Sequence, residues 1–145
     1  MRNVARILGV LVLAIGLMAA VSATASAKKG RTVTNPAADS VHAAILGGLR
    51  LVKKGDFDGW VNTYCDKANL CYNSNAIRTL KKYNLPELQR RSSNCLKDGG
   101  KSIFVTKEQE KPGGGVKLFL QCNPKGMPRP FHLLKTGTKW LWTNV

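Results

Sequence analysis

The four cysteines are the residues of this sequence with the clearest chemistry: Cys65, Cys71, Cys95 and Cys122. Four cysteines permit three pairings. We favour Cys65 with Cys71, which closes a local loop, and Cys95 with Cys122, which ties a helix end to a strand, because neither pairing requires the chain to cross the core. The spacing argues against zinc, since no CxxC occurs and only 2 histidines are present. We therefore expect two disulfides, no metal site and no cofactor.

A group of cations on predicted helices is the second chemically significant set. Arg78, Lys81 and Lys82 occupy positions i, i+3 and i+4, so one helix presents all three together. Arg90 and Lys97 extend this helical basic patch along the outer side of the next helix. The whole chain has 23 lysines and arginines against 8 acidic residues, a formal net charge of +15. Such an excess attracts polyanions.

Two further patterns give weaker indications. His42 and His132 are the acid and base that a secreted ribonuclease would need, but no spacing in the sequence fixes one against the other. The stretch Lys111–Lys117, KPGGGVK, lacks the GxxxxGK[ST] spacing of a phosphate-binding loop and precedes a predicted strand. We expect a hairpin loop there.

The first 27 residues are typical of a cleavable secretory signal peptide. Arg2 and Arg6 precede an apolar run over residues 7–21, and Ala25-Ser26-Ala27 follows it. The run is shorter than the ~20 residues that a membrane-spanning helix needs. We expect cleavage after Ala27 and export to the periplasm or the extracellular medium, where an even set of cysteines forms disulfides. Removing the two arginines leaves +13 on the mature chain.

The elements that must position these residues begin with an amphipathic helix, which Asn35-Pro36 starts and Gly55 ends. Asp56 then caps a second helix. Residues 28–35 are expected to be a flexible lead-in. The core-facing positions of the first helix recur at helical spacing: Val41, Ala44, Ile45, Gly48, Leu49 and Val52. The predicted helices cover residues 36–54, 57–65, 76–83 and 85–96.

The second half of the sequence reads as strands. Alternating apolar residues and turn signals predict strands over residues 101–107, 116–123, 130–135 and 139–145. Short connections between successive strands favour an antiparallel meander. The sequence therefore predicts one α+β domain over residues 36–145, with N-terminal helices packed on a curved four-strand meander.

This order of elements resembles the nuclear transport factor 2-like superfamily. The residues that carry the resemblance are Gly55–Trp60, Pro130–Leu134 and Lys139–Trp142, and the likeness spans most of residues 36–145. It implies a cone-shaped α+β fold. Because this fold hosts enzymes, binding modules and interaction domains, the resemblance alone selects no function.

The resemblance also implies candidate site residues. Catalytic members pair an Asp or His base with a Tyr or a second His in the cone cavity, and here the candidates are Asp58, Tyr64 and His132. The plainer interpretation places Asp58 in a helix first turn, Tyr64 in the core and His132 on the surface. The largest groups available to line or fill the cone, and so to contact a small apolar ligand, are aromatic: Trp60, Phe104, Phe119, Trp140 and Trp142.

These observations predict an exported, non-enzymatic binding or accessory domain that contacts an acidic envelope component or an acidic protein. Export makes nucleic acid a poor candidate partner. The alternative is a small-molecule isomerase or lyase with its site in the cone cavity. An open cavity that holds His132 or Asp58 against Tyr64 would favour the enzyme, and a cone filled by tryptophans would favour the binding domain.

Overall fold

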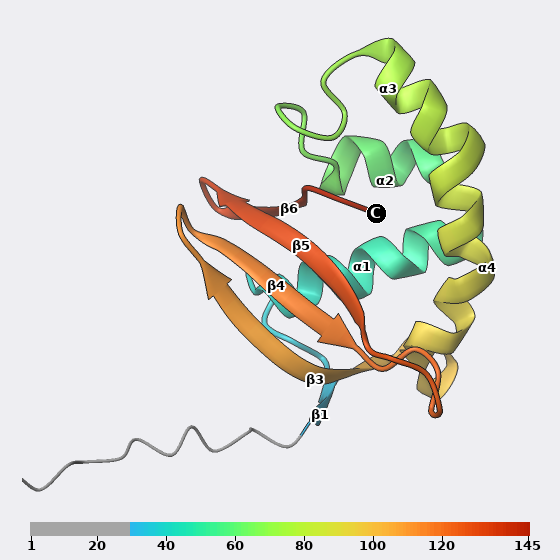
Figure 1. Ribbon diagram of the computed structural model, residues 1–145, viewed down its shortest axis with the longest axis vertical. Helices are drawn as coiled ribbons and strands as arrows, with labels where there is room; N and C mark the ends of the chain where they lie inside the picture. Colours follow the sequence, from blue (N-terminus) through green and yellow to red (C-terminus); the bar gives the residue numbers. More distant parts are fainter. Residues whose placement is uncertain (1–29) are drawn as a thin grey trace, which may run out of the picture.

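Helices cover one face of a curled antiparallel sheet (Figure 1). The computed structural model describes residues 30–145, so the predicted signal peptide lies outside the described residues. The α+β class and the curled antiparallel sheet are confirmed, but the sheet has 6 strands where four were expected. The strands are β1 (Arg31–Thr34), β2 (Leu96–Lys97), β3 (Ser102–Lys111), β4 (Gly115–Leu120), β5 (Arg129–Thr136) and β6 (Lys139–Trp142). They run in the order β1-β3-β4-β5-β6, and β2 also pairs with β3.

The start of the domain differs from the expectation. Residues 31–34, predicted to belong to a flexible lead-in, form β1 and pair antiparallel with β3. Helix α1 is Val41–Lys54 and begins five positions later than predicted. Asn35 has a φ of 50°, in the left-handed region, and a residue before proline disfavours helical geometry. The helix cap is instead Ser40, whose side chain accepts a hydrogen bond from the backbone N–H of Ala43 at 3.1 Å.

The junction between α1 and α2 (Phe57–Tyr64) follows the prediction. Gly55 ends α1 with a φ of 76°, and its N–H donates to the carbonyl of Val52 at 3.0 Å. Asp56 caps α2 by accepting from the N–H of Gly59 at 2.9 Å. The two helices therefore turn sharply without leaving their terminal backbone groups unpaired.

One continuous helical run replaces the two separate helices predicted over residues 76–96. It consists of α3 (Ser74–Thr79), a π-helical turn (Leu80–Asn84) and α4 (Leu85–Cys95). Asn84 does not stop the helix; the N–H of Leu85 donates instead to the carbonyl of Leu80. Pro86 has no N–H, and its ring would press on the carbonyl four residues earlier in a regular helix. The wider π-helical turn accommodates the proline without ending the run.

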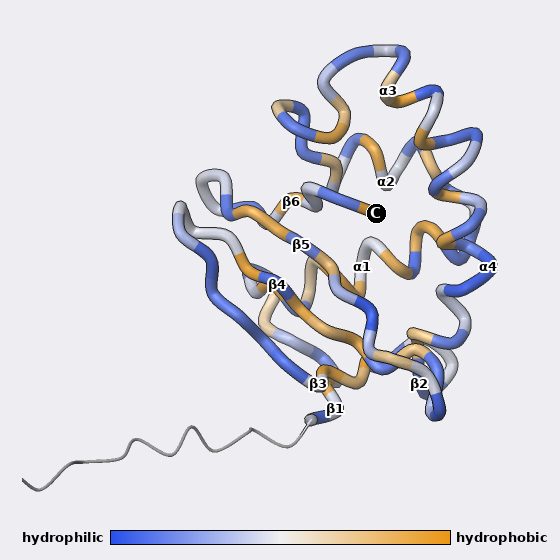
Figure 2. The backbone as a smooth tube through the Cα atoms, viewed as in Figure 1, coloured by the Kyte–Doolittle hydropathy of each residue, from blue (hydrophilic) through white to orange (hydrophobic). Residues whose placement is uncertain are grey.

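A β-bulge in β3 sets which side chains face the core. Val105 pairs with Leu120, whereas Lys107 pairs with Phe119 and Glu108 with Leu118, so the register shifts between Val105 and Lys107. The strand continues to Lys111, beyond the predicted end at residue 107, and its second half is hydrophilic (Figure 2). Because paired residues share a face, Glu108 lies on the inner face with Leu118 and Lys107 on the outer face with Phe119.

The ends of the other strands also differ modestly from the prediction. Gly113 and Gly114 have φ of 79° and 78°, and they form the hairpin turn between β3 and β4 in the glycine run. Strand β6 ends at Trp142, three residues before the predicted end. Within residues 30–145, no helix has the length and apolar character needed to cross a bilayer.

Two tryptophans fill the space between helices and sheet. Trp60 and Trp142 are fully buried, with ring centroids 5.4 Å apart and planes at 89°. Phe131 packs on Trp142 at 5.3 Å. Helix α1 approaches so closely that a Cβ on Gly48 would lie 2.7 Å from the Trp142 ring. The Trp142 indole N–H donates to the Ala44 carbonyl at 3.3 Å, which fixes the ring against α1.

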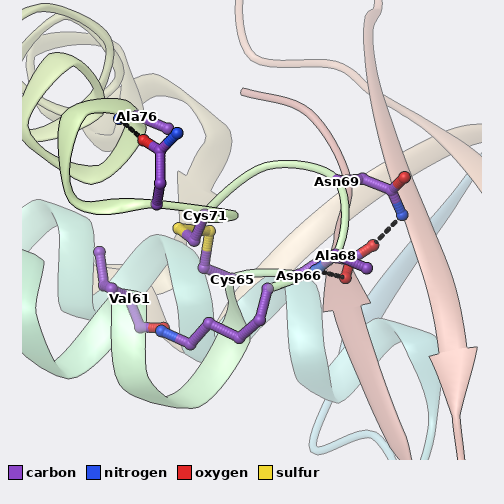
Figure 3. The surroundings of a disulfide bond; sticks show 9 residues. Val61, Cys65, Asp66, Ala68, Asn69, Cys71 and Ala76 are labelled. Atoms are coloured by element: carbon purple, nitrogen blue, oxygen red, sulfur yellow. Dashed lines mark hydrogen bonds between the residues drawn. A yellow bond between two sulfur atoms is a disulfide. The ribbon is translucent and has the colours of Figure 1, made fainter.

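Two disulfides brace this arrangement, with the pairing favoured from the sequence. Cys65 pairs with Cys71 in the loop after α2 (Figure 3). Cys95, at the end of α4, pairs with Cys122, just after β4. The described residues contain no free cysteine. Both bridges are consistent with an exported protein, since disulfides persist in oxidising compartments.

Candidate functional site

The three candidate catalytic residues lie apart. Asp58 is exposed and accepts a hydrogen bond from Lys81 Nζ at 2.6 Å. Tyr64 is half-buried against α1 at Gly47, and burial raises the pKa of its phenol. His132 pairs with Lys117 across the sheet. No hydrogen bond within residues 30–145 joins any two of the three candidate side chains, so the structure assembles no acid–base site from them.

The two histidines lie on opposite faces of the sheet. His132 pairs with Lys117 on the outer face, where burial and then the charge of Lys117 hold the pKa of the imidazole below its usual range. His42 Nε2 lies 3.2 Å from Glu108 Oε2, on the inner face. Burial is the main cause that lowers the pKa of His42. The sheet therefore separates the acid–base pair that a ribonuclease would need.

The five aromatic residues do not share one cavity. Trp60 and Trp142 fill the cone, and Trp140 is partly buried nearby, donating its indole N–H to the Asp39 carbonyl at 3.1 Å. Phe104 and Phe119 lie on the outer face, because the residues flanking each of them in the strand face the core. The expectation that all five line the cone interior is wrong for these two. The alternation of apolar residues in the sequence of β4 was the available signal, because Phe119 lies between the core-facing Leu118 and Leu120 and so points to the opposite face.

Many cations of the helical basic patch already have partners. Lys81 pairs with Asp58, and the Arg78 guanidinium donates to Asn75 Oδ1 at 2.9 Å. Arg90 forms an ion pair with Glu87, whose pKa is lowered chiefly by that hydrogen bond. Lys97 donates to the Asn94 carbonyl at 2.6 Å, and Lys82 lies 5.0 Å from the Tyr83 ring. Of these contacts, only the Lys81–Asp58 and Arg90–Glu87 ion pairs offset positive charge that the helices present to a partner.

The outer face of the sheet carries a cationic surface that the sequence reasoning missed. Lys117 and Lys107 lie 5.0 and 5.8 Å from the Phe119 ring centroid, at cation–π distance. Lys111 lies near enough to His132 to lower its pKa. We call this surface the sheet cation face, and it comprises Lys107, Lys111, Lys117, Phe119 and His132.

The sheet cation face has no carboxylate among the strand residues that form it. Glu108 and Glu110 pair with Leu118 and Val116, which are buried, so both acids point to the inner face. The outward positions of β3 after the bulge are Lys107, Gln109 and Lys111. The β-bulge therefore sorts the charges of β3, with acids inside and lysines outside. The sequence carried a signal for this sorting: in residues 107–111, KEQEK, the acids occupy every second position and so share one face of a strand, while the lysines share the other.

Neither a metal centre among the described residues nor a similar protein marks a site. Residues 30–145 contain no group of three His, Cys, Asp or Glu side chains arranged to hold a metal ion. No family model, no curated protein and no solved structure matches the chain.

Proposed function

We propose that this protein is an exported, non-enzymatic binding domain with a nuclear transport factor 2-like fold. The sheet cation face is its contact surface for an acidic polymer of the cell envelope. The observation that carries the proposal is the placement of Lys107 and Lys117 over the Phe119 ring, with Lys111 near His132, on strand positions that include no carboxylate. Two disulfides and a cone filled by Trp60 and Trp142 support it.

Two lysines of this face differ from Lys81 of the helical basic patch in what they contact. Lys107 and Lys117 lie over an aromatic ring, whose face attracts a cation without neutralising its charge. Lys81 lies against a carboxylate, which must be displaced before another anion binds. An incoming polyanion therefore meets full positive charge on the sheet. Exposed charges act over ~8 Å at physiological ionic strength, so three neighbouring lysines act together on a polymer with repeated negative groups.

Charge reversal on the two surfaces tests the proposal. The double variants Lys107→Glu/Lys117→Glu and Lys81→Glu/Lys82→Glu change the net charge equally, so they form a matched pair. We expect the sheet variant to bind poly-L-glutamate roughly tenfold more weakly, because several modest ion pairs are lost at once. The helix variant should lose much less. Affinity measured at increasing salt should fall steeply for the unaltered protein.

Three results would contradict the proposal. Equal losses in the two variants would mean that only net charge matters. A larger loss in the helix variant would move the contact to the helical basic patch. Salt-insensitive binding would exclude an electrostatic contact. Circular dichroism of both variants serves as the control that the fold is retained.

A further inference from the structure

A groove of about 450 Å³ opens on the surface of the domain, and none of the residues that line it belongs to the sheet cation face. It lies where the disulfide loop, the helical run and the residues after β6 meet. Its size falls in the range of small-molecule sites. The polar and aromatic side chains that line it include Tyr72, Asn73, Asn75, Asn84 and Asn144.

Four asparagines make this groove rich in hydrogen-bond donors. Asn73 Oδ1 accepts from the N–H of Ala76 at 2.8 Å, and Asn75 Oδ1 accepts from Arg78. Asn144 Oδ1 accepts from the backbone N–H of His132 at 3.0 Å. An amide side chain has one carbonyl and one NH₂ group, so these three contacts engage the oxygens and leave the NH₂ groups for a ligand. Asn84 makes no capping hydrogen bond at the start of α4.

An apolar floor and one exposed aromatic ring complete the groove. Leu80 is buried at 6% exposure, and Leu70 and Ala76 line the groove beside it. Tyr72 is 64% exposed and presents a ring with a hydroxyl group at the groove's edge. Every side chain that lines the groove is neutral at pH 7, and the charge among the lining residues is the α-carboxylate of Val145, the last residue of the sequence. The groove therefore offers hydrogen bonds and apolar contact but no cation.

A disulfide, the hydrogen bonds of Asp66 and the π-helical turn order the segments that form the walls of the groove. The Cys65–Cys71 disulfide closes the loop before Tyr72, and buried Asp66 accepts from the Ala68 N–H at 2.9 Å and from the Asn69 side chain (Figure 3). In the π-helical turn the N–H of Leu85 donates to the carbonyl of Leu80, five residues earlier, and both Leu80 and Asn84 belong to this turn. Because these contacts already order the groove residues, a ligand that binds there loses less free energy to immobilising side chains.

We propose that this groove binds a neutral saccharide that carries N-acetyl groups. The acetamido carbonyl and the ring hydroxyls supply the acceptors that the asparagine NH₂ groups need. The acetyl methyl group suits the floor at Leu80, and the apolar face of a sugar ring suits Tyr72. A small inorganic anion fits poorly because no cation lines the groove, and a purely apolar ligand would leave several amides without partners.

Calorimetric titration of the whole folded protein with triacetylchitotriose tests this inference, with maltotriose as a neutral trisaccharide that lacks acetamido groups. We expect triacetylchitotriose to bind and maltotriose to bind at least tenfold more weakly. Tyr72→Ala and Asn84→Ala should each weaken binding by roughly tenfold. Tyr83→Ala is the matched control, because Tyr83 is 60% exposed in the same helical run but does not line the groove.

The outcomes that overturn the inference are distinct from those that overturn the proposed function. Absence of binding at millimolar triacetylchitotriose, or equal binding of maltotriose, would reject the N-acetylated saccharide. Loss of binding in Tyr83→Ala with none in Tyr72→Ala and Asn84→Ala would place the ligand elsewhere. The Lys107→Glu/Lys117→Glu variant should bind the saccharide unchanged, since the groove contains neither lysine. Thermal unfolding of each variant checks that it is folded.

Discussion

His42 is a residue at which protonation and folding are connected. Its side chain is 12% exposed, and its Nε2 lies near Glu108 and 3.4 Å from the Arg31 guanidinium. Burial is the strongest influence on its pKa and lowers it; Arg31 acts in the same direction and Glu108 opposes both. The net result is a folded-state pKa below the ordinary value of 6.5.

The predicted consequence is a loss of stability in mild acid. The unfolded chain takes up a proton at His42 near pH 6.5, whereas the folded chain does so only at lower pH. The free energy of unfolding should therefore decline as the pH falls from about 7 to about 5. His42→Gln should flatten this decline in urea titrations. His132→Gln is the comparison variant, since the pKa of His132 is also lowered; a slope that persists in the double variant would refute the assignment.

At the scale of elements, the two disulfides are expected to differ in their contribution. The Cys95–Cys122 bridge spans a sequence separation of 27, and the Cys65–Cys71 bridge spans 6. The longer loop restricts the unfolded chain more, so its removal should cost about 3–4 kcal/mol against about 2–2.5 kcal/mol for the shorter one. Guanidinium unfolding of Cys95→Ala/Cys122→Ala and of Cys65→Ala/Cys71→Ala measures both costs. The opposite order would show that native-state packing outweighs loop length.

The sequence predicted well those elements whose ends are determined by residues at the ends themselves. Gly55 and Asp56 determine the junction of α1 and α2 through their own backbone and side-chain hydrogen bonds. The continuous helical run was missed because Asn84 and Pro86 are common at helix ends, and only the π-helical turn reconciles them with a helix. Strand β1 was missed because Arg31–Thr34 is short and polar, and its strand conformation depends on pairing with the distant β3.

The candidate sites were harder to predict because they depend on distant segments. The sheet cation face requires the bulge between Val105 and Lys107, which sends lysines outward and acids inward. The groove brings together Tyr72, Asn84 and Asn144, which no sequence spacing connects. Most partners of the helical cations lie within three residues along the chain, such as Glu87 for Arg90, but Asp58, the partner of Lys81, comes from a different helix that no sequence spacing connects to it.

At the scale of the whole molecule, signal-peptide cleavage and the described fold are compatible. Strand β1 begins at Arg31, so cleavage after Ala27 leaves every strand of the described residues intact. We expect N-terminal sequencing of protein recovered outside the cytoplasm to begin at Lys28. A protein produced from residue 28 should show the disulfides and thermal unfolding of the exported material. An exported chain that still begins at Met1 would refute the cleavage, and one that begins after Thr34 would have lost β1.

The position of Trp142 has a consequence for the newly made chain. Strand β6 follows every other element in the sequence, yet its indole fills the centre of the core against Gly48, Trp60 and Phe131. Until the ribosome has added β6, Gly48, Trp60 and Phe131 have no Trp142 ring to pack against. The hydrogen bond between Trp142 and α1 joins residues 98 positions apart, so it cannot form before then. The core therefore cannot close around Trp142 before β6 has been added, and until then the chain lacks a contact that would resist its passage through a translocation channel for unfolded polypeptides.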